Sequence, residues 1–293
     1  MSERGWTSTL ALGKSRSVRI LVGLSCFAIL SYFLRKTLYK PGPLQEGESK
    51  FAEKLPLHLR DVSALYVIPG GGSGAGMNNI DKHYPEWTRR RVKAAFEHHR
   101  KEGNKTPLFV ALSAGSLNTP NTAHEDGRIK FECQHMIEHL ADLGVPRSSV
   151  IGDFMSWDTV TNALFLRMVI NGVRVAQKKN LRSKKLPIEV FISDFHAERV
   201  QAAFEWVLGL RPSMLPDVVL TINKVSSEGI EWPDAEAFSS RVEHEKKGVQ
   251  QIKDNAKIIQ TATELDAFVT LGPHKGIFNY LHHQLPAKTG SGW

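Results

Sequence analysis

Short β-rich runs alternate with longer helical stretches along residues 62–225, and this alternation constrains the fold more than any other feature of the sequence. The β-rich runs contain few polar residues, which is typical of a parallel sheet covered by helices on both faces. We therefore predict an α/β, doubly wound and mainly parallel sheet of about five strands. The expected strands are 64–69, 107–113, 149–152, 188–193 and 217–222, and the expected helices are 85–102, 130–143, 158–178 and 196–209.

Two segments flank this core. Residues 41–61 are polar with three prolines and are typical of a linker. After residue 225 the alternation stops, and the charged stretch 234–262 predicts one long helix. The expected organisation is an N-terminal tail and anchor (1–40), a linker (41–61), an α/β domain (62–225) and a C-terminal helical extension (226–293).

The basic residues are concentrated at the N-terminus. The chain carries a net charge of +8, of which residues 1–40 contribute +6 and surround the apolar run 18–34. A nucleic-acid-binding domain would instead carry a basic patch on its folded surface, so we expect no nucleic-acid partner. Basic residues on both sides of an apolar run indicate a membrane segment.

This run is short for a membrane span, because about 20 residues cross a bilayer core. A cleaved signal peptide is the alternative, but no small-residue cleavage site follows Leu34 and the chain continues with Arg35 and Lys36. We expect an uncleaved single-pass signal anchor. The basic residues before the run slightly favour a cytoplasmic N-terminus, which would leave the following domain on the non-cytoplasmic side of the membrane.

Ligands of open α/β sheets bind beyond the carboxyl ends of the strands, so the residues that follow each strand carry most of the functional signal. Gly70, Gly71 and Gly72 follow the first strand, and exposed N–H groups in such a turn can hold an anion. A flexible turn is the alternative. Ser113 and Gly115 follow the second strand, either as ligand contacts or as a plain turn.

Polar residues also follow the third and fourth strands. Asp158 is a good helix cap, and Thr159 and Asn162 share its side of the first turn. After the fourth strand, His196 at a helix start would be kept neutral by the helix dipole, as a general base requires. The alternative is a surface histidine behind a capping residue.

The fourth strand is followed by two further charged candidates. Asp194 is the expected cap or a ligand contact. Arg199 lies one turn after His196 and could bind a phosphate or a carboxylate.

Two helices supply the other candidates. Arg89, in the run Arg89-Arg90-Arg91, lies within reach of the glycine-rich turn and is the expected phosphate ligand. Glu132 begins the second helix close to the strand ends. His135 and His139 spell a metalloprotease-like pattern, but their helical phase puts them on the solvent side, so we expect no metal site.

These motifs, in this order, resemble the domain-of-unknown-function 218 family of bacterial envelope proteins over about residues 62–211. The resemblance implies a Rossmann-like fold, polar residues gathered at the strand ends, an N-terminal anchor and a role in surface-polymer biogenesis. It leaves the cofactor unknown, with S-adenosylmethionine as one option. Pro69, Asp194 and the C-terminal extension depart from the family pattern. The resemblance is carried by Gly70-Gly71-Gly72, Arg89, Ser113-Ala114-Gly115, Glu132, Leu143-Gly144-Val145-Pro146, Ser156, Asp158-Thr159, Asn162, His196 and Arg199.

Three hypotheses follow. The first is a membrane-anchored enzyme for a phosphorylated, nucleotide-like or lipid-linked substrate, with His196 and Glu132 as general acid and base. The second is a non-catalytic module that binds S-adenosylmethionine or a nucleotide. The third is a tethered scaffold whose C-terminal helix supplies an interface. The small anionic ligand of the first two would be bound by Gly70, Gly71, Gly72, Arg89, Ser113, Gly115, Asp158, Thr159, Asn162, Asp194 and Arg199.

Overall fold

A computed structural model describes residues 57–71, 84–103, 105–116, 122–123, 129–177, 184–232 and 235–271, all within one compact unit. The expected membrane segment 18–34 and Gly72 lie outside these residues. Within the described ranges, no helix is both long and apolar enough to cross a membrane. The end of the expected linker forms a short 3-10 helix, η1 (Leu57–Asp61).

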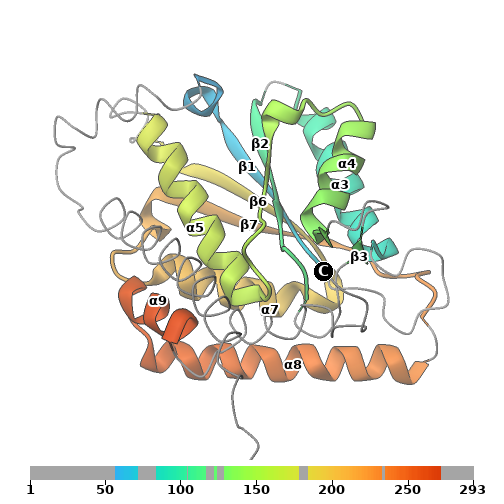
Figure 1. Ribbon diagram of the computed structural model, residues 1–293, viewed down its shortest axis with the longest axis vertical. Helices are drawn as coiled ribbons and strands as arrows, with labels where there is room; N and C mark the ends of the chain where they lie inside the picture. The colour runs from blue at the N-terminus through green and yellow to red at the C-terminus, as the bar shows by residue number, and fades with distance from the viewer. Residues whose placement is uncertain are drawn as a thin grey trace, which may run out of the picture. The chain divides into compact units, whose positions relative to one another are not determined.

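A five-stranded, all-parallel sheet forms the centre of the molecule and confirms the predicted α/β class (Figure 1). The strand order is β5-β2-β1-β6-β7, so the chain builds outward from β1 on one side and then returns to build on the other. The point where the direction reverses lies between β1 and β6. The strands are β1 (Ala64–Pro69), β2 (Pro107–Leu112), β5 (Val150–Gly152), β6 (Leu186–Ser193) and β7 (Val218–Val225).

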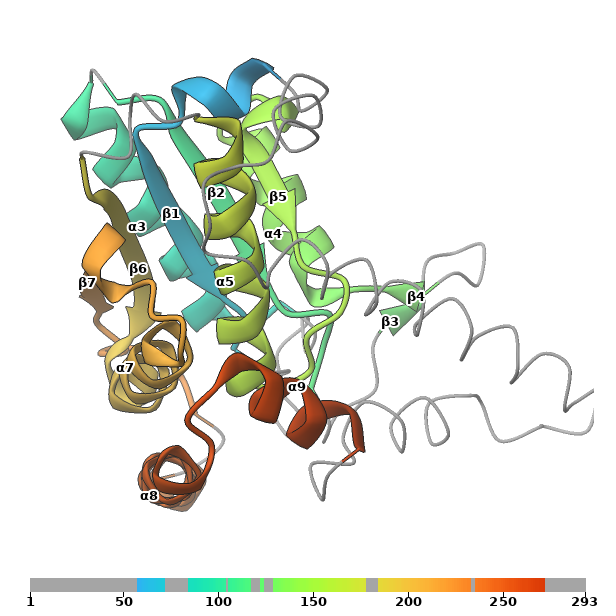
Figure 2. The same ribbon diagram turned by 90° about the vertical axis from the view of Figure 1, so that its left-hand side faces the viewer.

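Helices cover both faces of this sheet, which makes it doubly wound in a Rossmann-like order (Figure 2). One face packs against α3 (Glu86–Glu102) and α4 (Glu132–Asp142), and the other against α5 (Thr159–Ala176) and α7 (Asp194–Gly209). Successive strand residues point to opposite faces. Tyr66 and Ile68 of β1 accordingly join the α3 side of the core, whereas Leu65 and Val67 join the α7 side.

The C-terminal extension consists of two helices, α8 (Ala235–Ile258) and α9 (Ala262–Leu271). The helix expected over 234–262 therefore ends earlier than its composition suggests, at Ile258. In Figure 1, α8 runs alongside α7. The indole Nε1 of Trp206 on α7 donates to the carbonyl of Ile259 at 3.1 Å, and Leu265 of α9 is fully buried in the α7-side core.

A small antiparallel ribbon, β3 (Thr122–Ala123) and β4 (Ile129–Lys130), precedes α4. Its two-residue strands are too short to leave a periodic signal in the sequence. The residue after β4, Phe131, is the N-cap of α4, so the ribbon leads directly into that helix and its first residue Glu132.

Candidate functional site

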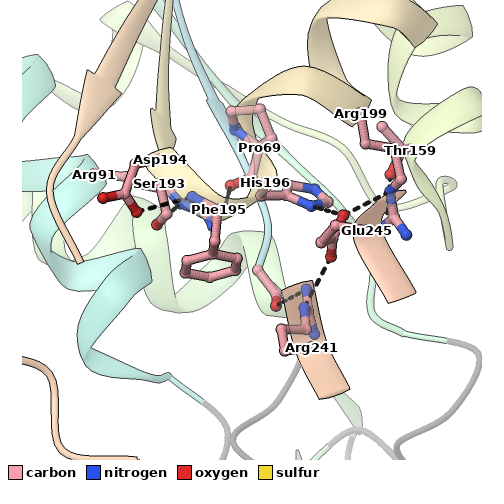
Figure 3. Close-up of polar contacts among 11 residues, drawn as sticks. Pro69, Arg91, Thr159, Ser193, Asp194, Phe195, His196, Arg199, Arg241 and Glu245 are labelled. Atoms are coloured by element: carbon pink, nitrogen blue, oxygen red, sulfur yellow. Dashed lines mark hydrogen bonds and ion pairs between the residues drawn. The ribbon is translucent and has the colours of Figure 1, made fainter. Parts of the chain in front are cut away.

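The carboxyl ends of β1 and β6 lie side by side where the winding direction of the sheet reverses. In open α/β sheets this switch point is where ligands bind. Arg91 reaches it from α3: its Nη1 donates to the carbonyl of Pro69 at 2.8 Å, and its Nε donates to the hydroxyl of Ser193 at 2.9 Å (Figure 3). These two contacts fix a guanidinium group between the last residues of the two strands.

The Arg91 side chain is fully buried, and its Nη2 has no hydrogen-bond partner among the described residues. Burial lowers its pKa to about 9, while Glu132 and Glu245 act in the opposite direction. The group is therefore still protonated at neutral pH. A buried charge with an unpaired donor is costly unless a further partner is supplied.

The glycine turn after β1 is packed too tightly to carry side chains. A Cβ on Gly70 would come within 2.5 Å of the Cβ of Ser113, and one on Gly71 within 2.7 Å of the hydroxyl of Thr88. The N–H of Gly70 donates to the carbonyl of Leu112. The N–H groups of both glycines are thus used within the protein, because that of Gly71 donates to Glu132 at 2.7 Å, and they do not form the free anion cradle expected from the sequence.

Glu132 connects the ends of two strands. Its Oε1 accepts from Gly71 after β1, and its Oε2 lies 2.8 Å from the hydroxyl of Ser113 after β2. The same hydroxyl lies 2.9 Å from the carbonyl of Gly115. Ser113 has a φ of 100°, a conformation that costs energy for a residue other than glycine, and its hydroxyl contacts hold it there. The structure thus brings three predicted residues together with the glycine turn.

Two further unpaired donors lie beside Gly71. The indole Nε1 of Trp87 and the hydroxyl of Thr88 are buried without a hydrogen-bond partner in the described part of the chain, and both would contact a Cβ on Gly71. They belong to the first turn of α3, where backbone N–H groups also favour a negative charge. Together with Arg91, they make this helix start the most donor-rich part of the site.

A second cluster forms around Glu245 of α8. Its Oε2 lies 2.6 Å from Nδ1 of His196 and 3.1 Å from Nε of Arg199, and its Oε1 lies 2.8 Å from Nε of Arg241. The hydroxyl of Thr159 on α5 accepts from Nη2 of Arg199 at 2.9 Å. Figure 3 shows these side chains meeting from α5, α7 and α8 at one end of the sheet.

Burial and the neighbouring charges together set the protonation states in this cluster. Burial lowers the pKa of His196, against an opposite effect of Glu245, so the imidazole is neutral at neutral pH. Burial alone would raise the pKa of Glu245, but His196, Arg199 and Arg241 together outweigh it and lower that pKa to about 2. A neutral imidazole next to an ionised carboxylate carries its proton on the nitrogen that faces the carboxylate, here Nδ1.

The start of α5 holds three predicted residues. Asp158 caps the helix by accepting from the N–H of Thr161 at 2.8 Å, as the capping interpretation predicted. Asn162 is buried one turn on, and its Oδ1 has no hydrogen-bond partner among the described residues. Because Thr159 contacts Arg199, this helix start lies next to the Glu245 cluster.

Arg89 and Asp194, which the sequence also singled out, make other contacts. The Nε of Arg89 donates to the carbonyl of Tyr84, and its guanidinium lies over that ring at 4.8 Å. Asp194 accepts from the hydroxyl and the N–H of Ser227, and the cap position of α7 belongs to Ser193 rather than to Asp194. His196 is buried, so the surface-histidine alternative is wrong.

The pair His135 and His139 also departs from expectation. Both are half-buried rather than pointing freely to solvent. The hydroxyl of Tyr84 lies 2.8 Å from Nδ1 of His139, and the Tyr84 ring stacks on His135. Across the described ranges, no group of three or more potential metal-ligating side chains is present.

Three buried charged residues near the strand ends escaped the sequence analysis. Arg91 is four residues after the buried Trp87 and four before the buried Ala95, so the helical phase of α3 could have selected it over Arg89.

The other two residues gave different signals. Glu245 stands at a position of α8 where the spacing of the apolar residues calls for another apolar residue. Asp153 follows β5 directly; its Oδ1 accepts from the N–H groups of Met155 and Ser156, and burial raises its pKa.

Comparisons with protein-family models, with curated proteins and with solved structures found no match to this chain. The likeness to the domain-of-unknown-function 218 family therefore stays a prediction from its motifs. The site combines buried cationic donors, a carboxyl group on either side of them (Glu132 and Glu245) and a neutral histidine.

Proposed function

We propose that this chain is a membrane-anchored enzyme that acts on a small phosphorylated substrate, nucleotide-like or lipid-linked, at the carboxyl ends of β1 and β6. The observation that carries this proposal is the unpaired Nη2 of Arg91. Guanidinium groups bind phosphate strongly and directionally. An incoming phosphate oxygen would give the buried charge of Arg91 the partner that it lacks.

The neighbouring groups support the same ligand. Trp87 and Thr88 offer two more unpaired donors beside Gly71, at the start of a 17-residue helix. These donors would replace the N–H groups of Gly70 and Gly71, which already donate to the carbonyl of Leu112 and to Glu132. Phosphate binding is thus assigned to the first turns of α3 rather than to the glycine backbone.

His196 and Glu132 are the proposed acid–base pair. A neutral imidazole can accept a proton at Nε2 from an attacking water or hydroxyl group, which is the task of a general base. Glu132 is held by Gly71 and Ser113 on the opposite side of the switch point. As the general acid, Glu132 would enter the step protonated and give its proton to the leaving group; the proton that His196 took from the nucleophile then leaves to solvent, from which Glu132 is reprotonated.

The anchor and the biological setting rest on sequence. The apolar run 18–34 and its flanking basic residues would tether the domain to a membrane, with the domain on the non-cytoplasmic side. Together with the motif resemblance, this tether favours a role in membrane or surface-polymer biogenesis. The phosphorylated substrate would then be either a lipid-linked phosphate or a soluble nucleotide or sugar nucleotide.

A ligand screen by thermal shift on the full chain in detergent micelles tests this proposal. The ligands are inorganic phosphate, nucleotides, sugar nucleotides, a polyprenyl phosphate and, for the binding-module alternative, S-adenosylmethionine. A ligand present at 100 times its dissociation constant stabilises the protein by about 2.7 kcal/mol, enough to raise the melting temperature measurably. We expect a shift from phosphate-bearing ligands.

Arg91→Lys is the diagnostic variant, because it keeps the charge and removes the forked donor geometry. We expect it to weaken the phosphate-bearing ligand at least tenfold, and Arg89→Lys, on the same helix, to leave affinity within about twofold. Stabilisation by S-adenosylmethionine alone, without turnover on long incubation, would favour the binding module. If no ligand shifts the melting temperature, or if Arg91→Lys binds like the wild type, the proposed site is wrong.

A further inference from the structure

A carboxylate from the C-terminal extension lies in the interior of the site. On α8, apolar residues recur at alternating spacings of four and three, which places a continuous stripe against α7. Glu245 takes one position of this stripe and is only 4% exposed. The other members are Phe238, Val242, Val249, Ile252 and Ala256. A carboxylate at such a position costs desolvation energy that an apolar residue would avoid.

Each oxygen of this carboxylate lies within ion-pair distance of a nitrogen. Oε2 contacts His196 at 2.6 Å and Arg199 at 3.1 Å, and Oε1 contacts Arg241 at 2.8 Å. His196 and Arg199 belong to α7, whose first turn follows the switch-point strand β6. Arg241 extends the link, because its Nη2 lies 3.4 Å from the carbonyl of Gly71. The carboxylate of α8 is thus connected to the ends of both β6 and β1 (Figure 3).

The contact between α7 and α8 is close enough to fix Glu245 in place. A Cβ on Gly248, one turn after Glu245, would come within 2.5 Å of Cδ of Arg199. A larger residue there would therefore displace the Arg199 side chain from its place beside Glu245. Ile252, one turn further, is buried in the same interface. This packing holds the part of α8 that carries Glu245 against α7.

His196 has two ring nitrogens in different surroundings. Nδ1 faces Glu245, whereas Nε2 contacts no hydrogen-bonding group of the described residues. A carboxylate that accepts from Nδ1–H fixes the ring orientation and the tautomer, and leaves the lone pair on Nε2. Nε2 is then the nitrogen that can take a proton from a substrate or a water molecule.

We infer that Glu245 is a positioning residue, which holds His196 with its proton on Nδ1 and its basic nitrogen, Nε2, available to the substrate. The inference rests on the proposed function, in which His196 is the general base, and extends it to a helix outside the α/β core. Arg199 and Arg241 keep the carboxylate ionised and oriented. The competing role for a buried carboxylate is purely structural: to fix the register of α8 on α7.

The tautomer of His196 distinguishes these roles. A carboxylate that only fixed the register of α8 on α7 would not require His196 to carry its proton on a particular nitrogen. Ring-¹⁵N-histidine NMR of the full chain in detergent micelles, with His196→Gln to assign the signals, reports which nitrogen carries the proton. We expect Nδ1–H for His196 in the wild type, with a downfield proton signal from the short contact to Glu245. A wild-type ring protonated on Nε2 overturns the inference without any variant at Glu245.

Glu245→Gln removes the charge at nearly constant shape. We expect it to abolish the downfield signal and to populate the Nε2–H tautomer. Glu243→Gln, an exposed position on the same helix, should leave both features unchanged. Retention of pure Nδ1–H and of the downfield signal in Glu245→Gln overturns the inference.

This measurement uses the unliganded protein and is independent of the ligand screen. A failed screen with the Nδ1–H tautomer present would count against the proposed function alone. The opposite result is also possible: the protein binds a ligand in a manner that depends on Arg91, but His196 carries its proton on Nε2. That result would overturn the positioning role alone.

Discussion

At the scale of single residues, the site is a set of buried charges that compensate one another. Arg91 lies within electrostatic reach of Glu132 and Glu245, and the latter also contacts His196. Such groups stabilise the fold only while each retains its charge state, because an uncompensated buried charge costs several kcal/mol. Proton uptake should therefore be a sensitive probe of this cluster.

Stability should fall as the pH is lowered from neutral, partly because of His196. Burial lowers the pKa of its folded-state imidazole to about 3, from the ordinary value of 6.5 for an exposed histidine. Between these pH values the unfolded chain binds a proton that the folded chain does not, so unfolding becomes easier by up to about 1.4 kcal/mol per pH unit from this group. Glu245 acts in the same direction below its unfolded pKa of 4.5, since its folded pKa is about 2.

Urea unfolding at pH 7, 6 and 5 measures this dependence. His196→Gln keeps a donor for Glu245 but cannot titrate. We expect its free energy of unfolding to decline less steeply with falling pH than that of the wild type. Equal slopes for the two proteins would mean that folding leaves the pKa of His196 unchanged, which would contradict its burial as a neutral group.

At the scale of elements, the strands were predictable and the residues that complete the site were not. Parallel strands that are buried on both faces appear in the sequence as apolar runs, whichever strands they pair with. The predicted strand 64–69 therefore matches β1 residue for residue. The choice between Arg89 and Arg91 depends on which face of α3 is buried. Two residues correspond to about half a helical turn, so a shift of two positions exchanges the buried and the exposed arginine. Glu245 joins the site through a contact between segments 49 residues apart, and no local pattern encodes such a contact.

The short helix α9 gives a direct test of how firmly the C-terminal extension is attached. Leu265 is fully buried against the α7-side core, whereas Ile258, at the end of α8, is 77% exposed. Leu265→Ala should cost about 2–5 kcal/mol through lost burial and a cavity. Ile258→Ala should stay within about 0.5 kcal/mol of the wild type. Urea unfolding at pH 7 measures both, and equal stability of the two variants would show that α9 is detached in solution.

At the scale of the whole described unit, the extension and the α/β core share one hydrophobic interior and one polar site. Ile252, Ile259 and Leu265 belong to the same buried cluster as the strands. The rings of Trp87 on α3 and Trp232 before α8 stack with centroids 5.1 Å apart. Contacts of this kind on several sides of the sheet join the folding of α8 to that of the core.

We therefore expect α8 and the sheet to unfold in a single transition. Hydrogen exchange at increasing urea, followed by mass spectrometry on the full chain in micelles, should show peptides from 235–258 and from 186–193 losing protection at the same midpoint. An independent extension would lose protection at lower urea, as a separate step. Because Glu245 contacts His196 only while α8 is docked, that outcome would also mean that the site at the strand ends exists in two forms, with and without its carboxylate.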